Sequence, residues 1–426
     1  MKKIHFLGIG GSGASAIAKI AEAQGYEVTG CDLYPNNEFT IVFQKDQIFE
    51  GHSPNHLKNV DILAVTPAIY SLDPNNIELQ EAKEKNIEIL TWQEFMGKYL
   101  QKEKQVIAVC GTHGKSTTTA MIGLLLEDVG LDPTVQLGAI IPQWGHNYRI
   151  GNSKYFVTEA DEFNDNFLST HPNITVVTTV EMDHPEYFKD FEAYKKSFTN
   201  FLNQTKDKII ANLQDKGVVD ILSSDSSLKD KTIDYSKEII DFELKIPGEH
   251  NKLNASAAFQ VGLNLGIKPE IIQKSLENFT GIGRRFEYLG NFQGSEVYSD
   301  FGHHPTELKV TLEAAISKFP DKKITVIFQP HMFSRTLALF NDFVNVLKNL
   351  AVDKIFIMDI YKSRELDKGL VNSKQLVEAI NKENVFYTGS EKDILNKIES
   401  MNKDNQIIFF IGAGDIHDLA KKLVTN

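Results

Sequence analysis

The stretch from Val106 to Thr118, V-I-A-V-C-G-T-H-G-K-S-T-T, joins an apolar run to a glycine-rich turn and a Lys-Ser pair. The run Val106–Cys110 predicts a strand, and the residues from Lys115 to about Val129 predict a helix. A glycine turn at this junction lets backbone N–H groups approach an anion, and the helix dipole adds to the attraction. We therefore predict a phosphate-binding loop here.

The loop differs from the usual G-x-x-x-x-G-K-[ST] pattern, because its first glycine would fall at Val109. Lys115 is expected to reach the outer phosphates of a nucleotide, and the Ser116 hydroxyl to bind Mg²⁺. The predicted nucleotide-binding residues of the loop are Gly111, Thr112, His113, Gly114, Lys115, Ser116 and Thr117.

Acidic residues follow two later strand-like runs. Glu159 ends K-Y-F-V-T-E in the sequence E-A-D-E, and Glu181, Asp183 and His184 follow I-T-V-V-T-T-V. Ligands bind outside the carboxyl ends of parallel strands, so both groups should border the phosphate loop. Oxygen ligands suit Mg²⁺, and an imidazole can help to hold a second ion. The alternative is that E-A-D-E is a solvated turn and Asp183 a helix cap.

The N-terminal run Lys3–Ile9 predicts a strand that leads into a second glycine-rich turn of the G-x-G-x-x-G type. Asp32 closes the next predicted strand, at the place of an acid that contacts ribose in dinucleotide-binding folds. The pattern indicates a diphosphate on a helix N-terminus, in a dinucleotide or a UDP-sugar. The predicted contacts are Gly8, Gly10, Gly11, Ser12, Gly13 and Asp32.

Four polar motifs lie in the second half of the chain. Asp300–Glu307 and Gln329–Arg335 each follow a predicted strand, and the paired histidines of the first lack the spacing of a known metal site. Arg284–Arg285 could clamp an anionic group or be a solvated linker pair. Asn251 and Asn254 share one helical face, where they could cap the helix or contact a nucleotide.

Strand, helix and strand alternate along the whole chain, which predicts an α/β fold with mainly parallel sheets and flanking helices. The expected domains are 1–104, Rossmann-like; 105–280, a central domain with the phosphate loop; and 281–426, again Rossmann-like.

The composition limits the function classes. The 426 residues carry a net charge of −12, which disfavours nucleic-acid binding. The two cysteines, Cys31 and Cys110, each end a strand-like run and are expected to pack in a core in a reducing cytosol. No stretch approaches the length of a membrane span, so we expect a cytoplasmic protein that does not bind a membrane.

The motifs together resemble the Mur ligase family, the amino-acid ligases of peptidoglycan synthesis. The resemblance runs along the whole chain through nine motifs in order: HFLGIGGSG, GTHGKSTTT, EADE, EMDH, GEHNKLNA, GIGRRFE, DFGHHPTE, FQPHMFSR and GAGDI.

The resemblance implies a UDP-sugar-binding N-terminal domain, a central ATPase domain and a C-terminal domain that helps to hold an amino acid. It implies that the phosphate loop binds ATP, with Lys115, His184 and Arg335 in catalysis. Further implied roles are nucleotide contacts for Asn251, Asn254 and Arg285, amino-acid contacts for His303, His331 and Arg335, and Mg²⁺ ligands in Ser116, Glu159 and His184.

The implied reaction joins L-alanine, or another small amino acid, to the carboxylate of UDP-N-acetylmuramate. ATP first converts that carboxylate to an acyl phosphate, an amine then attacks, and ADP and phosphate are released; His184 or His303 takes the proton from the amine. Such a ligase would serve cell-wall biogenesis, cell shape and cell division. Two departures concern the amino acid: Met332 replaces one arginine of an expected pair, and Phe301 replaces a tyrosine.

Three other functions are compatible with some of these motifs. A recycling ligase would attach the whole stem tripeptide to the same sugar, and a nonenzymatic relative would only bind nucleotide or UDP-sugar. An NAD-dependent oxidoreductase would use the first glycine turn, but it would leave the phosphate loop and E-A-D-E without a role. A monomer or a homodimer is expected.

Overall fold

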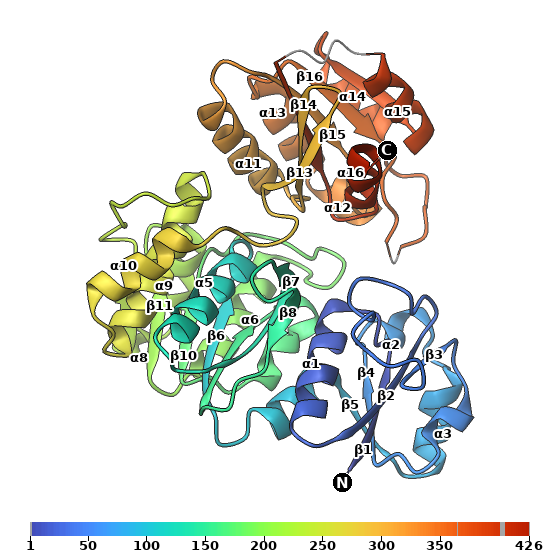
Figure 1. Cartoon of the computed structure of the whole chain (residues 1–426), viewed down its shortest axis with the longest axis vertical. Helices are drawn as coiled ribbons and strands as arrows, with labels where there is room; N and C mark the ends of the chain where they lie inside the picture. The colour runs from blue at the N-terminus through green and yellow to red at the C-terminus, as the bar shows by residue number, and fades with distance from the viewer. Residues whose placement is uncertain (1, 364, 401–404, 426) are drawn as a thin grey trace. The chain divides into compact units, whose positions relative to one another are not determined.

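The computed structural model describes residues 2–363, 365–400 and 405–425. These residues form two compact units (Figure 1). The first unit comprises residues up to Met182 together with Asp190–Glu243 and Leu253–Phe279. The second comprises Asp183–Lys189, Leu244–Lys252 and the described residues from Thr280 onward. Each unit is described by itself.

The first unit begins with a five-stranded parallel sheet in the order β3-β2-β1-β4-β5. Its strands are β1 (Lys3–Leu7), β2 (Glu27–Asp32), β3 (Ile48–Glu50), β4 (Ile62–Val65) and β5 (Glu88–Thr91). Its helical segments are α1 (Ser12–Ala23), a 3₁₀ turn (Pro54–Leu57), α2 (Ile69–Leu72), α3 (Ile77–Glu84), α4 (Trp92–Phe95) and a π-helical turn (Met96–Leu100).

Alternate side chains of these strands point to opposite faces of the sheet. Ile4 and Phe6 of β1 pack with Ile17 of α1 on one face, whereas Leu63 of β4 packs with Leu79 of α3 on the other. Figure 1 shows α1 and α3 on opposite sides of this sheet. The carboxyl end of β1, where the first glycine turn begins, therefore lies between two covered faces.

The second sheet of this unit has seven strands in the order β12-β11-β10-β6-β9-β7-β8, all parallel except for the pair β7 and β8. Its strands are β6 (Gln105–Cys110), β7 (Thr134–Ile141), β8 (His146–Arg149), β9 (Tyr155–Glu159), β10 (Ile174–Val177), β11 (Lys208–Ala211) and β12 (Thr232–Asp234). Its helices are α5 (Lys115–Asp128), a 3₁₀ segment (Phe163–Ser169), α6 (Phe191–Asn203), α7 (Lys216–Ser224), α8 (Ser226–Lys229), α9 (Glu249–Asn264) and α10 (Pro269–Asn278).

The second unit holds a six-stranded sheet in the order β13-β14-β18-β15-β16-β17, parallel except for β13 and β14. Its strands are β13 (Glu287–Phe292), β14 (Ser295–Asp300), β15 (Lys323–Phe328), β16 (Lys354–Met358), β17 (Val385–Gly389) and β18 (Gln406–Ile411). Its helices are α11 (Pro305–Lys318), α12 (Phe333–Ala338), α13 (Phe340–Asn349), α14 (Ser373–Ile380), α15 (Glu391–Glu399) and α16 (Ile416–Thr425).

The predicted α/β class with three mainly parallel sheets is confirmed. Helix α11 begins at Pro305, which needs no N–H partner in the first turn. The domain boundaries predicted at residues 104 and 280 remain a prediction.

One predicted strand was too long. The apolar run from Ile174 predicted a strand to Val180, but β10 ends at Val177. Thr178 and Thr179 leave the sheet because they hydrogen-bond to the phosphate loop: Thr178 Oγ1 donates to His113 O over 2.5 Å, and Thr179 O accepts from Thr112 N over 2.7 Å.

Both cysteines are free and buried, as predicted. Among the described residues, no helix is long and apolar enough to cross a membrane.

Candidate active site

The first glycine turn connects β1 to α1, and its backbone is held by the end of β2. Gly8 N and Ile9 N donate to Cys31 O over 2.9 and 3.1 Å, and Gly10 N donates to Asp32 Oδ2 over 2.9 Å. Gly8 has φ +87°, and a methyl group on it would lie 2.5 Å from Thr66 Cγ2. The turn therefore requires glycine at this position.

The structure brings the six predicted UDP-sugar contacts together in this turn and its rim. The Asp32 carboxylate accepts from the N–H groups of Gly10 and Tyr34, both over 2.9 Å, so it also fixes the shape of the turn. On the other side, Asn147 Nδ2 from β8 donates to Ser12 O over 2.7 Å. This bond joins the start of α1 to the second sheet.

The second glycine turn connects β6 to α5. Gly111 and Gly114 have φ of +129° and +83°, and a methyl group on Gly111 would lie 2.2 Å from Thr178 Oγ1. A methyl group on Gly114 would lie 2.4 Å from Asn254 Oδ1, which places the Asn254 side chain of α9 against the loop. Side chains at these two positions would fill the space beside the loop backbone, which a bound phosphate needs.

Lys115 turns its ammonium back over this loop. Its Nζ donates to Gly111 O over 2.6 Å and to Thr112 O over 3.2 Å, and it lies 3.0 Å from Glu162 Oε2. Burial by itself would lower the pKa of Lys115, but the carboxylates of Glu162 and its neighbours outweigh it and raise the pKa above its usual value. The ammonium therefore remains charged in a site shielded from water.

Ser116 and Glu159 lie side by side at the start of α5. Ser116 Oγ donates to Glu159 Oε2 over 2.9 Å, and Gly138 N donates to the same oxygen over 2.8 Å. Because Glu159 is paired with Val109 across β9 and β6, its carboxylate reaches the loop directly. Burial raises the pKa of Glu159, although these hydrogen bonds and Lys115 partly oppose the effect. A cation beside Glu159 would stabilise the charged carboxylate, which burial disfavours.

A buried polar network connects the loop to α6. The Tyr194 hydroxyl donates to Glu162 Oε1 over 2.9 Å and lies 3.1 Å from Thr112 Oγ1, which in turn donates to Glu181 O over 2.9 Å. Glu162 and Tyr194 have no exposed side-chain surface. The alternative that E-A-D-E is a solvated turn is therefore wrong for Glu162, which holds Lys115.

His113, another predicted loop residue, contacts Glu181 and not Glu162, the partner of Lys115. His113 Nε2 and Glu181 Oε1 form a hydrogen bond. Both predicted acidic groups follow strands that flank β6, since β9 and β10 are its two neighbours in the sheet. Asp183 and His184 belong to the second unit and are described there.

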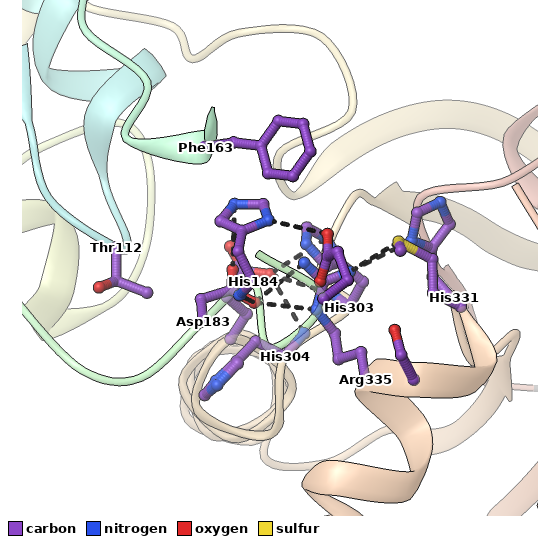
Figure 2. A network of polar contacts seen from close by, with 12 residues as sticks. Thr112, Phe163, Asp183, His184, His303, His304, His331 and Arg335 are labelled. Atoms are coloured by element: carbon purple, nitrogen blue, oxygen red, sulfur yellow. Dashed lines mark hydrogen bonds and ion pairs between the residues drawn. The ribbon is translucent and has the colours of Figure 1, made fainter. Parts of the chain in front are cut away.

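In the second unit, Asp183 is buried and paired with Arg335 of α12 (Figure 2). Nε and Nη2 of Arg335 donate to Asp183 Oδ1 over 3.0 and 2.9 Å. Burial alone would raise the pKa of Asp183, but Arg335, with the nearby histidines, holds it well below its usual range. Asp183 is therefore an ion-pair partner of Arg335 and not a helix cap.

His184 and His303 lie beside this pair (Figure 2). His184 has φ +54°, its N–H donates to Asp183 Oδ1 over 2.7 Å, and its Nδ1 lies 3.3 Å from Glu186 Oε1. His303 Nδ1 lies 3.0 Å from Phe301 O. Burial lowers the pKa of His303 to about 4, an effect that Glu307 opposes and Arg335 reinforces.

A carbonyl oxygen can only accept, so the hydrogen bond to Phe301 puts the proton of neutral His303 on Nδ1. Nε2 of His303 then keeps its lone pair at neutral pH. His331, the other predicted amino-acid contact, has its ring centroid 5.6 Å from that of His303, and its Nδ1 is 3.3 Å from Arg335 Nη1. Arg335, His303 and His331 are thus neighbours, as expected of one site.

The two departures from the family sequence lie in the same area. Met332 is buried with φ +70°, and its Sδ is 3.8 Å from Arg335 Nη1. The Phe301 ring is covered by the guanidinium of Arg284 at 4.8 Å. An apolar thioether and an apolar ring therefore replace two polar side chains beside the predicted amino-acid site.

The remaining predicted residues have local partners. Arg284 Nη2 donates to the carbonyl oxygens of Gly412 and Gly414, and Arg285 Nη1 donates to Glu307 Oε1 over 3.1 Å, so a solvated linker pair is excluded. Asn251 Nδ2 donates to Pro247 O over 2.7 Å at the start of α9. Arg285 and Asn251 belong to the second unit and Asn254 to the first.

Comparison with known proteins covers the whole chain. The family model "Mur ligase family, catalytic domain" matches residues 3–104, "Mur ligase middle domain" matches 109–238, and "Mur ligase, glutamate ligase domain" matches 284–414. The UDP-N-acetylmuramate–L-alanine ligase of Aquifex aeolicus is 35% identical over 98% of this chain and 96% of its own length. That of Alkaliphilus metalliredigens is 36% identical over 100% and 97%. The chain belongs to the Mur ligase family.

Solved Mur ligase structures share the fold. The UDP-N-acetylmuramate-alanine ligase of Thermotoga maritima has a TM-score of 0.82 at 28% identity, covering 100% of this chain and 99% of that one. A murein peptide ligase from Psychrobacter arcticus has a TM-score of 0.71 at 22% identity, covering 100% and 98%. The three sheets thus match the N-terminal, middle and C-terminal domains of Mur ligases, and the middle domain of these ATP-dependent ligases is the one that binds ATP.

Proposed function

We propose that this Mur ligase joins L-alanine, or another small amino acid, to the lactyl carboxylate of UDP-N-acetylmuramate in the cytoplasm. The observation that carries the proposal is the second glycine turn. There Lys115 and Ser116 each meet a buried or partly buried carboxylate, in a chain that matches alanine-adding relatives from end to end. This arrangement suits transfer of a phosphoryl group, which depends on positioning and charge neutralisation.

In this proposal, Lys115 exchanges its contacts with Gly111 O and Glu162 for the outer phosphates of ATP. The flexible lysine stem allows the move, and the raised pKa keeps the ammonium charged throughout. The carboxylate of UDP-N-acetylmuramate attacks the γ-phosphate, and the ammonium stabilises the charge that develops on the transferred group. The loop N–H groups from Gly114 to Thr117 hold the other phosphates.

The residues present fit a magnesium ion. Ser116 Oγ and Glu159 Oε2 are hard oxygen ligands 2.9 Å apart, and Glu159 lies in a site where burial disfavours its charge. Mg²⁺, when bound, neutralises charge on the phosphate oxygens. We propose His184 as a ligand of a second ion, as the resemblance implies. Asn251, Asn254 and Arg285 complete the nucleotide contacts.

The second unit supplies the amino-acid site in this proposal. Arg335 is held by Asp183 through Nε and Nη2, which leaves the edge with Nη1, beside His331, to meet the amino-acid carboxylate. His303 carries a lone pair on Nε2 and so can take a proton from the amine that attacks the acyl phosphate. His184 is the other candidate for this step. Water must stay away from the acyl phosphate until the amine attacks.

The test is ADP release with UDP-N-acetylmuramate, ATP and Mg²⁺ in the presence of alanine, glycine, serine or the stem tripeptide. The proposal expects turnover with one small amino acid, alanine first. Turnover only with the tripeptide would replace it by the recycling function. Nucleotide binding with no amine-dependent ADP release would replace it by a nonenzymatic binding function.

A further inference from the structure

Four side chains that the ligase chemistry does not use meet on the face of the first sheet that α3 covers. His5 comes from β1, Cys31 from β2, His56 from the 3₁₀ turn Pro54–Leu57, and Glu78 from the first turn of α3. His5, Cys31 and Glu78 are completely buried, and His56 is nearly so. One ligand atom from each lies within 4.8 Å of all the others.

The distances around the Glu78 carboxylate are short. Cys31 Sγ lies 3.3 Å from Oε1 and 3.4 Å from Oε2, His56 Nδ1 lies 2.9 Å from Oε1, and His5 Nε2 lies 3.3 Å from Oε2. In a tetrahedral site with bonds of about 2.0–2.3 Å, neighbouring ligand atoms are about 3.3–3.8 Å apart. The cluster is therefore close to the size of a metal site before any ion enters.

The orientation of His5 is the second observation. Its Nδ1 is hydrogen-bonded to Thr29 Oγ1 over 2.9 Å, which fixes the ring and directs Nε2 into the cluster. Although Nε2 is near Glu78, it makes no hydrogen bond there and is buried. A metal-binding histidine in general has its other ring nitrogen held in this way by a polar neighbour.

We propose that His5, Cys31, His56 and Glu78 bind one divalent cation of the borderline class, with Zn²⁺ as the best fit. Thiolate and imidazole ligands select such ions over Mg²⁺. The Cys31 thiolate and the Glu78 carboxylate carry two negative charges, which cancel the charge of the ion in a buried site. On binding, a Zn–S bond replaces the S–H bond, and the thiol proton passes to solvent.

The charge states of the free cluster agree with this assignment. Burial alone would raise the pKa of Glu78, but the nearby His5 ring, the Ser53 N–H and His56 lower it to about 2, so the carboxylate is available as a ligand. Burial lowers the pKa of His5, which leaves its imidazole neutral. Burial, with Glu78, raises the pKa of Cys31, so the thiol keeps its proton until a metal displaces it.

The surroundings are those of a closed structural site. The Phe49 ring stacks on His56 with centroids 4.4 Å apart and also faces His5. His52 Nδ1 lies 3.3 Å from Cys31 Sγ, where it can donate to the bound thiolate. Cys31 O accepts the N–H groups of Gly8 and Ile9, so an ion on the Cys31 side chain would also brace the first glycine turn.

The test uses the full chain after removal of metal with a chelator, titrated with Co²⁺ as a spectroscopic substitute for Zn²⁺. We expect one equivalent to give a sulfur-to-cobalt charge-transfer band in the near ultraviolet. Cys31→Ser should lose the band, whereas Cys110→Ala should keep it, because Cys110 is equally buried but belongs to none of the clusters of potential metal ligands among the described residues.

A second variant covers the case in which Cys31→Ser fails to fold. His56→Gln changes the most accessible ligand and should weaken zinc binding at least tenfold, with zinc content measured by mass spectrometry after dialysis. Zn²⁺ should also raise the Tm of the wild type but not that of His56→Gln. Absence of the charge-transfer band in the wild type, or equal zinc content in all variants, would overturn the proposal.

Discussion

The two glycine-rich turns, Gly8–Gly13 and Gly111–Gly114, occupy the same place between a parallel strand and a helix, yet they differ in charge. In the first, the charged side chain that hydrogen-bonds to the turn is a carboxylate, Asp32, which accepts from Gly10 N. In the second, Lys115 lies over the turn, with Glu162 and Glu159 close by.

The difference matches the two roles that we propose. A diphosphate that is only held needs N–H groups and a helix dipole, which the first turn provides. A phosphoryl group that is transferred also needs a positive charge that follows it through the reaction and stabilises its developing negative charge. The ammonium group of a flexible lysine can do this. The presence of a cation therefore distinguishes the reacting nucleotide site from the binding one.

The largest expected effect comes from removing that cation. Lys115→Ala should lower kcat for ADP release at least about a thousandfold, because it deletes the charge that stabilises the transferred phosphoryl group. Calorimetry should show unchanged binding of UDP-N-acetylmuramate. Near-normal activity of the variant would contradict the role of Lys115 in phosphoryl transfer, on which the comparison of the two turns depends.

The matching change in the first turn is Asp32→Asn. It keeps the shape but replaces an oxygen that accepts from Gly10 N by an amide, so the turn loses a charge-assisted hydrogen bond. We expect the KM for the UDP-sugar to rise about thirtyfold and the affinity for ATP, measured by calorimetry, to stay the same. A loss of ATP affinity instead would show that the two turns are not independent.

A smaller effect should follow from Tyr194→Phe, which removes the hydroxyl that donates to Glu162. Leaving a buried carboxylate with one donor fewer costs about 1–3 kcal/mol, so the free energy of unfolding should fall by that amount in denaturant titrations. The control is Tyr99→Phe, which removes a comparable 2.7 Å bond to Glu88 at the surface. Equal losses in both variants would contradict the importance of the buried network.

The smallest expected effect is a loss of stability at lower pH. It limits the pH range in which the two turns can be compared. His417 is buried with Nδ1 2.8 Å from Ser299 Oγ, and burial, with Lys421 and Arg284, lowers its pKa to about 3. The unfolded chain therefore binds a proton near pH 6.5 that the folded chain does not bind. Stability due to this group is complete above pH 6.5 and is lost progressively as the pH falls toward 3.

Between pH 7.5 and 5.5 the wild type should lose about 1 kcal/mol from this source. In His417→Gln the free energy of unfolding should depend less on pH over the same interval. The measurement is denaturant unfolding at both pH values. A steeper dependence in His417→Gln would mean that the sign is wrong.

Residues close together in the sequence allowed most of the fold and part of the site to be predicted. Helix α5 begins at Lys115, as predicted, and ends at Asp128, one residue before the predicted end. Ser116 meets Glu159 because β6 and β9 are neighbours. Hydrophobic periodicity and turn residues carry such information, since each acts within a few residues.

Partners that are distant in the sequence could not be predicted. Tyr194 reaches Thr112 across 82 positions, and Asp183 reaches Arg335 across 152. No local sequence pattern indicates either pair, and E-A-D-E predicted a metal site or a solvated turn but not the contact of Glu162 with Lys115. The cluster around Glu78 also escaped notice, because its four residues come from separate elements with no metal-binding spacing.

The most direct test of the two-site account is calorimetric titration of one protein sample with UDP-N-acetylmuramate and with a nonhydrolysable ATP analogue in Mg²⁺. The account predicts two one-to-one binding events that do not compete, the first weakened by Asp32→Asn and the second by Lys115→Ala. Competition between the two nucleotides for a single site would contradict it.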